Sequence, residues 1–169
     1  MGYHGTWRSS DQIPLRAVES GALDRFGHVD PSAGGESDHA SISFDATLKN
    51  TATTRLAAYA IFYRLNLFSN FTNFLDDPVN GDQFNQRDRR WVIGGSTQRT
   101  WSHSSATRSA TTLGVQGRAD IIGEVGLHRT QNRDRLATVR DDRVNEASAG
   151  VFAQNELRHC LLLRFTTVD

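Results

Sequence analysis

The stretch RLAAYAIFYRLNLFSNFTN, residues 55–73, decides the fold because its hydrophobic residues recur at every second position. One face is apolar or aromatic throughout and consists of Ala57, Tyr59, Ile61, Tyr63, Leu65 and Leu67. The other face begins apolar, turns polar, and consists of Ala58, Ala60, Phe62, Arg64 and Asn66. A period of two predicts a β-strand, because successive side chains of a strand point to opposite faces. The continuously apolar face is expected to pack on a protein core or to contact lipid, and the period alone leaves both open.

The same alternation predicts further strands on either side of this stretch. The cleanest example is residues 40–49, where Ala40, Ile42, Phe44, Ala46 and Leu48 alternate with polar residues. A turn at 50–53 follows, so that this strand and the quoted stretch are predicted to pair as a hairpin. The remaining strands are predicted at 3–8, 91–101, 111–120 with a continuation over 123–130, and 143–157. With a β-bulge expected at 121–123, the sequence predicts an all-β fold, an antiparallel meander of about six strands.

The predicted connections alternate between long and short. They cover residues 9–38, 50–53, 69–90, 102–108 and 131–142. Within the first, residues 14–26 are predicted to form one or two helical turns, with Pro14 at the start and Gly21 near the end. Successive strands of a meander run in opposite directions, so all the long connections are expected at one end of the sheet. Outer-membrane β-barrels have this asymmetry, with long outer loops and short periplasmic turns.

Aromatic and apolar side chains in the predicted strands fit the same architecture. Aromatic residues fall within or near the ends of strands, as in the interfacial girdles of barrels, and are Trp7, Trp91, Trp101, Tyr59 and Tyr63. The predicted apolar faces of the last strands carry Leu113, Val115 and Ala119, and then Ala147, Ala149, Val151 and Ala153. The alternative is that all these side chains form the core of a soluble protein.

The composition restricts the class of protein. The chain has 19 basic and 19 acidic residues, which argues against a nucleic-acid-binding protein that depends on bulk positive charge. The longest apolar run, residues 56–63, is far shorter than the ~18 residues of a membrane-spanning helix. A transmembrane β-barrel is compatible with the mean hydropathy of -0.50, because only alternate residues face lipid. The first ten residues lack the apolar segment of a secretory signal, which alone predicts a cytosolic protein or a missing true N-terminus.

Two segments carry a resemblance to TonB-dependent outer-membrane receptors. Residues 63–95, YRLNLFSNFTNFLDDPVNGDQFNQRDRRWVIGG, resemble a strand–outer loop–strand unit of that family. Residues 127–156, LHRTQNRDRLATVRDDRVNEASAGVFAQNE, resemble a second such unit, which ends in an AQNE strand. Residues 11–37 are similar to one of the family's outer loops.

The resemblance implies a partial receptor. Complete members have an export signal, an energy-coupling box, a plug domain and a barrel of roughly 22 strands. Residues 1–169 therefore resemble part of the barrel domain alone, without plug, signal and remaining strands, and the tail at 157–169 departs from the family's pattern. An open arc of strands has two unpaired edges, so we expect that the isolated chain does not insert as a monomeric channel.

The resemblance also implies a function. Such receptors lie in the outer membrane of Gram-negative bacteria and import a scarce solute, such as a ferric siderophore. The implied partners are outer-membrane lipid, the extracellular solute, and a TonB complex contacted only through the missing plug. No nucleic acid, cofactor or covalent chemistry is implied, so that the protein is expected not to be an enzyme and to have no catalytic residues. On this hypothesis the face with Tyr59, Ile61 and Tyr63 contacts acyl chains.

The candidate ligand-binding residues lie in the loop that follows the quoted stretch. Phe71, Phe74, Asp76 and Asp77 combine aromatic and acidic side chains suited to holding a solute. The competing interpretation is that both carboxylates cap a turn next to Pro78. Side chains expected to face the barrel lumen, where a plug would pack, are Arg64, Arg118 and Glu146.

Other reactive residues suggest no site. The histidines lack the spacing of metal ligands and are His4, His28, His39, His103, His128 and His159. Cys160 has no partner for a disulfide and no neighbouring motif. A hydrolase would need a nucleophile and base that no motif supplies. A soluble antiparallel β binding module is therefore the main alternative to the receptor.

Overall fold

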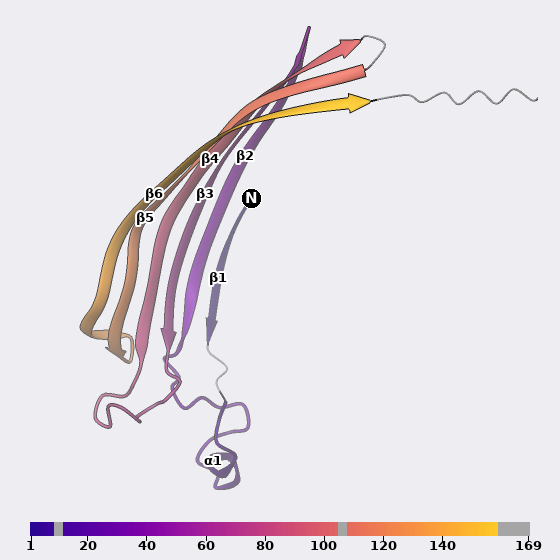
Figure 1. Ribbon diagram of the computed structural model, residues 1–169. Coiled ribbons are helices and arrows are strands. Elements are labelled where there is room, and N and C mark those ends of the chain that lie inside the picture. The colour runs from indigo at the N-terminus through magenta and orange to yellow at the C-terminus, as the bar shows by residue number, and fades with distance from the viewer. Residues whose placement is uncertain (9–11, 105–107, 159–169) are drawn as a thin grey trace, which may run out of the picture. The chain divides into compact units, whose positions relative to one another are not determined.

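The computed structural model describes residues 1–8, 12–104 and 108–158, which form one antiparallel sheet and one short helix (Figure 1). The elements in chain order are β1 (Gly2–Arg8), α1 (Leu15–Glu19), β2 (Gly34–Lys49), β3 (Thr53–Ser69), β4 (Phe84–Ser104), β5 (Arg108–Gln131) and β6 (Asp134–Arg158). Each strand pairs with the next one in the chain, so that the order in the sheet is β1-β2-β3-β4-β5-β6. The predicted all-β meander of six strands is confirmed.

The sheet is open. In the described part of the chain β1 and β6 lie at its two edges, and the sheet is not closed into a barrel. β1 pairs with β2 from Gly2 opposite Ala40 to Arg8 opposite Gly34. The outward backbone groups of an edge strand have no ladder partner, which makes such an edge a place where further strands can pair.

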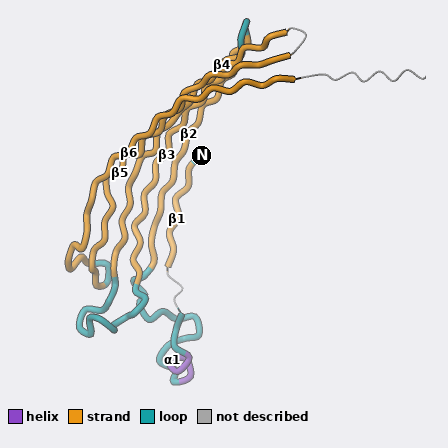
Figure 2. Tube along the Cα trace, in the orientation of Figure 1, coloured by secondary structure: helices purple, strands orange, loops and turns teal. Residues whose placement is uncertain are grey.

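The chain divides into two compact units. Unit 1 comprises Met1–Ile42, Ala60–Ile93 and Ala119–Glu146. Unit 2 comprises Ser43–Tyr59, Gly94–Arg118 and Ala147–Asp169. Strands β2 to β6 contribute residues to both units, whereas β1, α1 and the connections 12–33 and 70–83 belong to unit 1. Figure 2 shows these two connections at the same end of their strands.

The predicted helical segment contains α1. Pro14 precedes its first residue with φ −64, and Gly21 follows its last turn with φ 74, as predicted from their positions. In the described ranges, no helix is long and apolar enough to cross a membrane.

The predicted boundary of β4 is wrong. The strand begins at Phe84 and not at residue 91, so that the connection predicted at 69–90 covers only 70–83. Residues 85–90, NQRDRR, are polar at every position. They therefore lack the hydrophobic alternation by which a strand is recognised.

The long connection predicted at 131–142 is also wrong. Two residues, Asn132 with φ 49 and Arg133 with φ 73, join β5 to β6. Positive φ at both central residues is typical of the type I′ turn, which fits the twist of a hairpin. Only two of the three connections that the sequence predicts as long are therefore long in the structure.

Some predictions fall on residues outside the described ranges. The turn predicted at 102–108 includes 105–107, and β4 and β5 end and begin on either side of them. Residues 9–11 of the first connection and most of the tail, 159–169 with His159 and Cys160, lie outside as well.

The contacts between β4 and β5 indicate an extra residue in β5. Thr130 N donates to Gln83 O at 2.9 Å, and Thr100 Oγ1 lies 2.9 Å from Thr112 Oγ1. Between these two contacts the β4 side runs from residue 83 to 100, and the β5 side runs from 112 to 130. The β5 side is therefore one residue longer. A β-bulge adds one residue to one strand of a pair, and the bulge predicted at 121–123 lies within this interval.

Candidate functional site

Contacts between strands show which side chains share a face. Arg64 Nε donates to Asp38 Oδ2 at 2.6 Å, so that even-numbered residues of β2 and β3 lie on the same face. The Phe62 and Trp91 rings lie 5.0 Å apart, which adds the odd-numbered residues of β4. A Cβ placed on Gly94 would overlap the Tyr59 ring, which puts Tyr59 on the opposite face.

The assignment extends across unit 2. Because Thr100 and Thr112 are hydrogen-bonded, the even-numbered residues of β4 and the upper part of β5 share a face. A Cβ on Gly114 would overlap the Phe152 ring, which adds the even-numbered residues of β6. The other face of unit 2, called here the apolar face, carries Phe44, Ala46, Leu48, Leu56, Ala58, Leu113, Val115, Ala149, Val151 and Ala153. The alternation of β2, β5 and β6 predicted these stripes.

For β3 the structure contradicts the sequence-based hypothesis. Tyr59, Ile61 and Tyr63 are half-buried and lie opposite the apolar face. Ala58 and Phe62 lie on the side of the neighbouring apolar stripes instead. Both faces of β3 are apolar between residues 56 and 63, so that only the partner strands distinguish them. Arg64, which was predicted to face the lumen, lies on the face of Phe62. Arg118, which was predicted to face the lumen too, lies on the opposite face.

The apolar side chains of this face are exposed. Phe44 is 60% exposed and Val151 83%, and Leu48, Leu113 and Val115 are exposed as well. Contiguous exposed apolar surface marks a site of contact with lipid or with another protein. Among the described residues only five hydrophobic side chains are buried, namely Ala33, Ala52, Phe68, Val92 and Ile122. The sheet therefore has almost no core of its own.

In unit 1 the face that carries Phe62 and Trp91 changes from apolar to charged. The apolar residues are Ile42, Phe62 and Trp91, and the charged residues that follow them on this face are Asp38, Arg64 and Arg89. Trp91 lies within β4, and of the predicted girdle residues only Trp7 and Trp101 are near strand ends. The change occurs at neighbouring positions of three strands, because Arg64 contacts Asp38 and Phe62 contacts Trp91. Aromatic residues between apolar and charged zones are common at membrane–water interfaces.

The connection 70–83, which holds the predicted ligand-binding residues, is ordered by Asp82. Its carboxylate accepts hydrogen bonds from the N–H groups of Leu75 at 2.8 Å, Asp76 at 3.1 Å and Asp77 at 2.7 Å. Three donors on one carboxylate fix the loop's backbone.

The carboxylate of Asp77 caps the turn that follows it. Its carboxylate accepts from Val79 N at 3.1 Å and Asn80 N at 2.9 Å, and pairs with Arg129 Nη2 at 3.0 Å. This is the turn-capping role that the sequence left as the competing interpretation.

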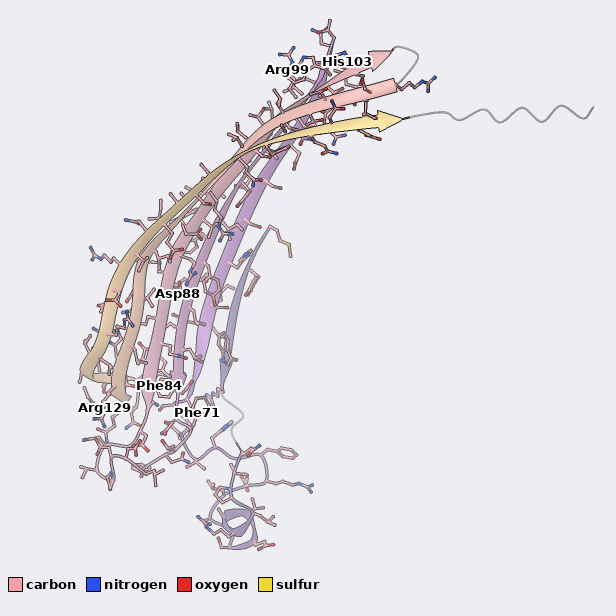
Figure 3. The ribbon with its side chains drawn as sticks, viewed as in Figure 1. Phe71, Phe84, Asp88, Arg99, His103 and Arg129 are labelled. Atoms are coloured by element: carbon pink, nitrogen blue, oxygen red, sulfur yellow. The ribbon has the colours of Figure 1, made fainter. Side chains whose placement is uncertain are left out.

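The other predicted residues are not gathered into one site. Phe71 is 75% exposed, with its ring 5.8 Å from that of Phe84. Phe74 packs against Gly81, whose φ of 83 favours glycine. Asp76 is exposed. Figure 3 shows Phe84 and Arg129 at the loop end of β4 and β5, on the side where Phe71 lies in the connection.

A buried hydrogen-bond network, which the sequence did not reveal, joins the connections of unit 1. Asp30 Oδ2 accepts from Asn70 Nδ2 and Gln83 Nε2, both at 2.8 Å. Gln83 Oε1 accepts from Thr130 Oγ1 and Arg133 N, both at 2.9 Å. Gln83 is only 3% exposed and Thr130 2%. A cavity of about 130 Å³ adjoins the network and is lined by Val29, Asp30, Asn70, Phe74, Gln83 and Asn132, among others.

Hydrogen bonds lower the pKa of three carboxylates in these connections, those of Asp30, Asp77 and Asp82. Burial raises the pKa of Asp30, but hydrogen bonds from Ser32, Asn70 and Gln83 outweigh it and leave the pKa below its ordinary value. Hydrogen bonds from the N–H and side chain of Asn80 lower the pKa of Asp77. The pKa of Asp82 is raised by burial and lowered more by its hydrogen bonds, for a net decrease.

We expect these connections to lose order in acid. Groups whose folded pKa is depressed stabilise the fold above their unfolded pKa, near 3.8, and this contribution is lost as the pH falls through the folded pKa. Amide hydrogen exchange in residues 70–83 should therefore be well protected at about pH 7 and faster, after correction for intrinsic rates, at about pH 3. Equal protection factors at both pH values would contradict the assigned roles. The strand amides of unit 2 serve as an internal control.

The described residues offer no metal centre. No group of three or more His, Cys, Asp and Glu in this part of the chain is placed to hold a metal ion. His128 is fully buried, with Nδ1 3.3 Å from Thr138 Oγ1 and with Nε2 lacking a hydrogen-bond partner among the described residues.

Comparison with known proteins identifies no relative. No protein-family description, no curated protein and no solved structure matches this sequence. The function must therefore be argued from the exposed face and the connections themselves.

Proposed function

We propose that the chain is part of a transmembrane β-barrel of the outer membrane, within a TonB-dependent receptor that takes up a scarce solute. The observation that carries the membrane part of the proposal is the exposed apolar face of unit 2. Its apolar residues come from β2, β3, β5 and β6, and the opposite face carries Ser96, Thr100, Gln116 and Arg118. Alternation between lipid-facing apolar residues and inward-facing polar ones is the pattern of barrel strands.

Strand length supports the proposal. β4, β5 and β6 have 21, 24 and 25 residues, whereas about 9–11 residues suffice to cross a bilayer. The surplus fits strands that continue beyond the membrane. The open edges at β1 and β6 fit a sheet that further strands complete.

Solute uptake rests on the resemblance of residues 63–95 and 127–156 to receptor segments. In this proposal the solute, an iron chelate or similar molecule, meets the connections of unit 1, where Phe71, Phe74 and Asp76 are candidates for contact. Asp77 contributes by holding the loop. The TonB complex would act through a plug domain, and lipid would cover the apolar face.

The proposal is tested by folding the chain with and without detergent. We expect it to aggregate in buffer, because the apolar face would be exposed to water, and to form a β-sheet in nonionic micelles, as measured by circular dichroism and light scattering. A soluble monomer that melts cooperatively without detergent would overturn the proposal. That result would favour the soluble β binding module, in which a second layer of protein covers the face.

A further inference from the structure

An arginine lies beside a groove on the apolar face of unit 2. Arg99 and Trp101 both lie on this face of β4, with the guanidinium carbon 5.5 Å from the centre of the indole ring. Figure 3 shows Arg99 and His103 near the same end of β4. In the described ranges Arg99 forms no ion pair, so its charge is available to a ligand.

The groove has apolar walls and a volume of about 460 Å³. Three strands line it, each with three consecutive residues, 97–99, 113–115 and 151–153. The side chains that stand on the apolar face include Leu113, Val115 and Val151, all of them exposed. The Phe152 side chain, like a Cβ added at Gly114, stands on the other face of the sheet, so the backbone of these two residues forms the floor of the groove. The groove is therefore a depression between rows of apolar side chains, with Arg99 at its margin.

The parts of β2, β3, β4 and β5 nearest Arg99 carry basic and no acidic residues. Residues 46–57 and 97–112 contain no aspartate or glutamate, and they carry Lys49, Arg55 and Arg108 in addition to Arg99. Of these four, only Arg99 stands on the apolar face, because Arg55 is on the side of Tyr59 and Arg108 on the side of Thr112. A ligand of this face would meet apolar walls and one guanidinium.

We propose that the groove binds a phospholipid, with an acyl chain between Leu113, Val115 and Val151 and the phosphate at Arg99. The inference rests on the proposed contact of this face with lipid and names the lipid group that it recognises. An acyl chain matches the apolar walls, and a guanidinium binds phosphate by charge-assisted, bidentate hydrogen bonds. Trp101 stacks on the same arginine, and indole rings favour the depth of lipid headgroups. A lipid with net negative charge is therefore preferred over a zwitterionic one.

The test uses the full chain with Trp7→Phe and Trp91→Phe, so that Trp101 is the one remaining indole. It is folded in nonionic micelles that contain phosphatidylglycerol or phosphatidylcholine with brominated acyl chains, which quench nearby tryptophan. We expect phosphatidylglycerol to quench at about fivefold lower mole fraction, as one basic side chain at a membrane surface provides. Arg99→Gln should remove this preference, Arg99→Lys should retain part of it, and Arg55→Gln, on the other face, should leave it intact. Unbrominated lipids give the reference intensity for each variant.

Each outcome decides between the inference and the proposed function. Equal quenching by both lipids, or a preference that survives Arg99→Gln, overturns the phosphate site and leaves the lipid contact in place. If Arg55→Gln also removes the preference, the preference arises from diffuse positive charge, and the phosphate site at Arg99 is overturned. A companion chain that keeps only Trp91 reports on unit 1. If Trp91 is quenched and Trp101 is not, only the proposed lipid groove is rejected. If neither is quenched, the membrane proposal is rejected as well.

Discussion

Replacing Ala58 with arginine is expected to lower the free energy of unfolding from micelles by about 2–4 kcal/mol, the effect of a charge on a lipid-facing strand position. Ala58→Arg puts the guanidinium on the apolar face, where Leu113 and Val115 are exposed. Ala57→Arg puts it on the side of Tyr59 and Gln116, where the groove that Ala57 lines is partly polar. We expect that change to lower the free energy of unfolding by about 1 kcal/mol or less.

These two variants form a matched pair, because neighbouring alanines receive the same side chain in the same strand of unit 2. Urea unfolding from micelles, followed by tryptophan fluorescence, gives both free energies. A second pair in β5, Val115→Arg and Gln116→Arg, should reproduce the difference with Val115 as the sensitive position. If Ala57→Arg were the more damaging change, the face predicted from the alternation of β3 alone would be right. Equal effects would remove the distinction between the faces.

The contrast between β2 and β3 shows what sequence periodicity can decide. In β2, Ser43, Asp45 and Thr47 separate the apolar residues, so that one face alone can be the apolar one. In β3, residues 56–63 are apolar at every position, and the strand pattern is clear although its orientation is not. The orientation follows from contacts with Asp38 and Gly94 in the partner strands. These contacts depend on strand register, which the period of one strand does not contain.

Charged strands and unmarked turns account for the errors in the connections. Residues 85–90 and 134–142 are polar or charged at most positions, so that their sequence predicts loops, although they form the first parts of β4 and β6. Hairpin turns of two residues are usually signalled by Asn-Gly or Asp-Gly. Here Arg133 takes the second position with φ 73, and the signal is missing. The Pro14 and Gly21 signals of α1, in contrast, were present and correct.

The sequence points to the loop at 70–83, but not to the hydrogen bonds that order it. The sequence singled out residues 71–77 by their aromatic and acidic side chains, and it offered the capping role of Asp77 as an alternative. Asp30, Gln83 and Thr130 come from three segments far apart in the chain, and each is unremarkable among its polar neighbours. Only the meander brings them together, so no local pattern could have shown that Gln83 is nearly fully buried.

The largest local effect in unit 1 is expected from Gln83→Leu. The leucine has a similar volume but makes no hydrogen bonds. Asp30 and Ser32 then lose the donor that Gln83 supplies, and Thr130 and Arg133 lose the acceptor. Buried polar groups left without partners cost about 1–3 kcal/mol each. We expect the free energy of local opening to fall by about 3 kcal/mol, and hydrogen-exchange protection of residues 70–83 to fall roughly a hundredfold.

Gln86→Leu is the matched control, since Gln86 lies three residues further along and is exposed. It should leave loop protection unchanged. If Gln83→Leu weakens protection in 70–83 and in the segment around Asp30 together, the two connections open as one unit, as their shared carboxylate requires. Loss confined to 70–83 would show that Asn70 alone suffices to hold Asp30. No loss in either segment would mean that the network does not fix the loops, and the candidate contacts of Phe71 and Phe74 with a solute would then lack a rigid support.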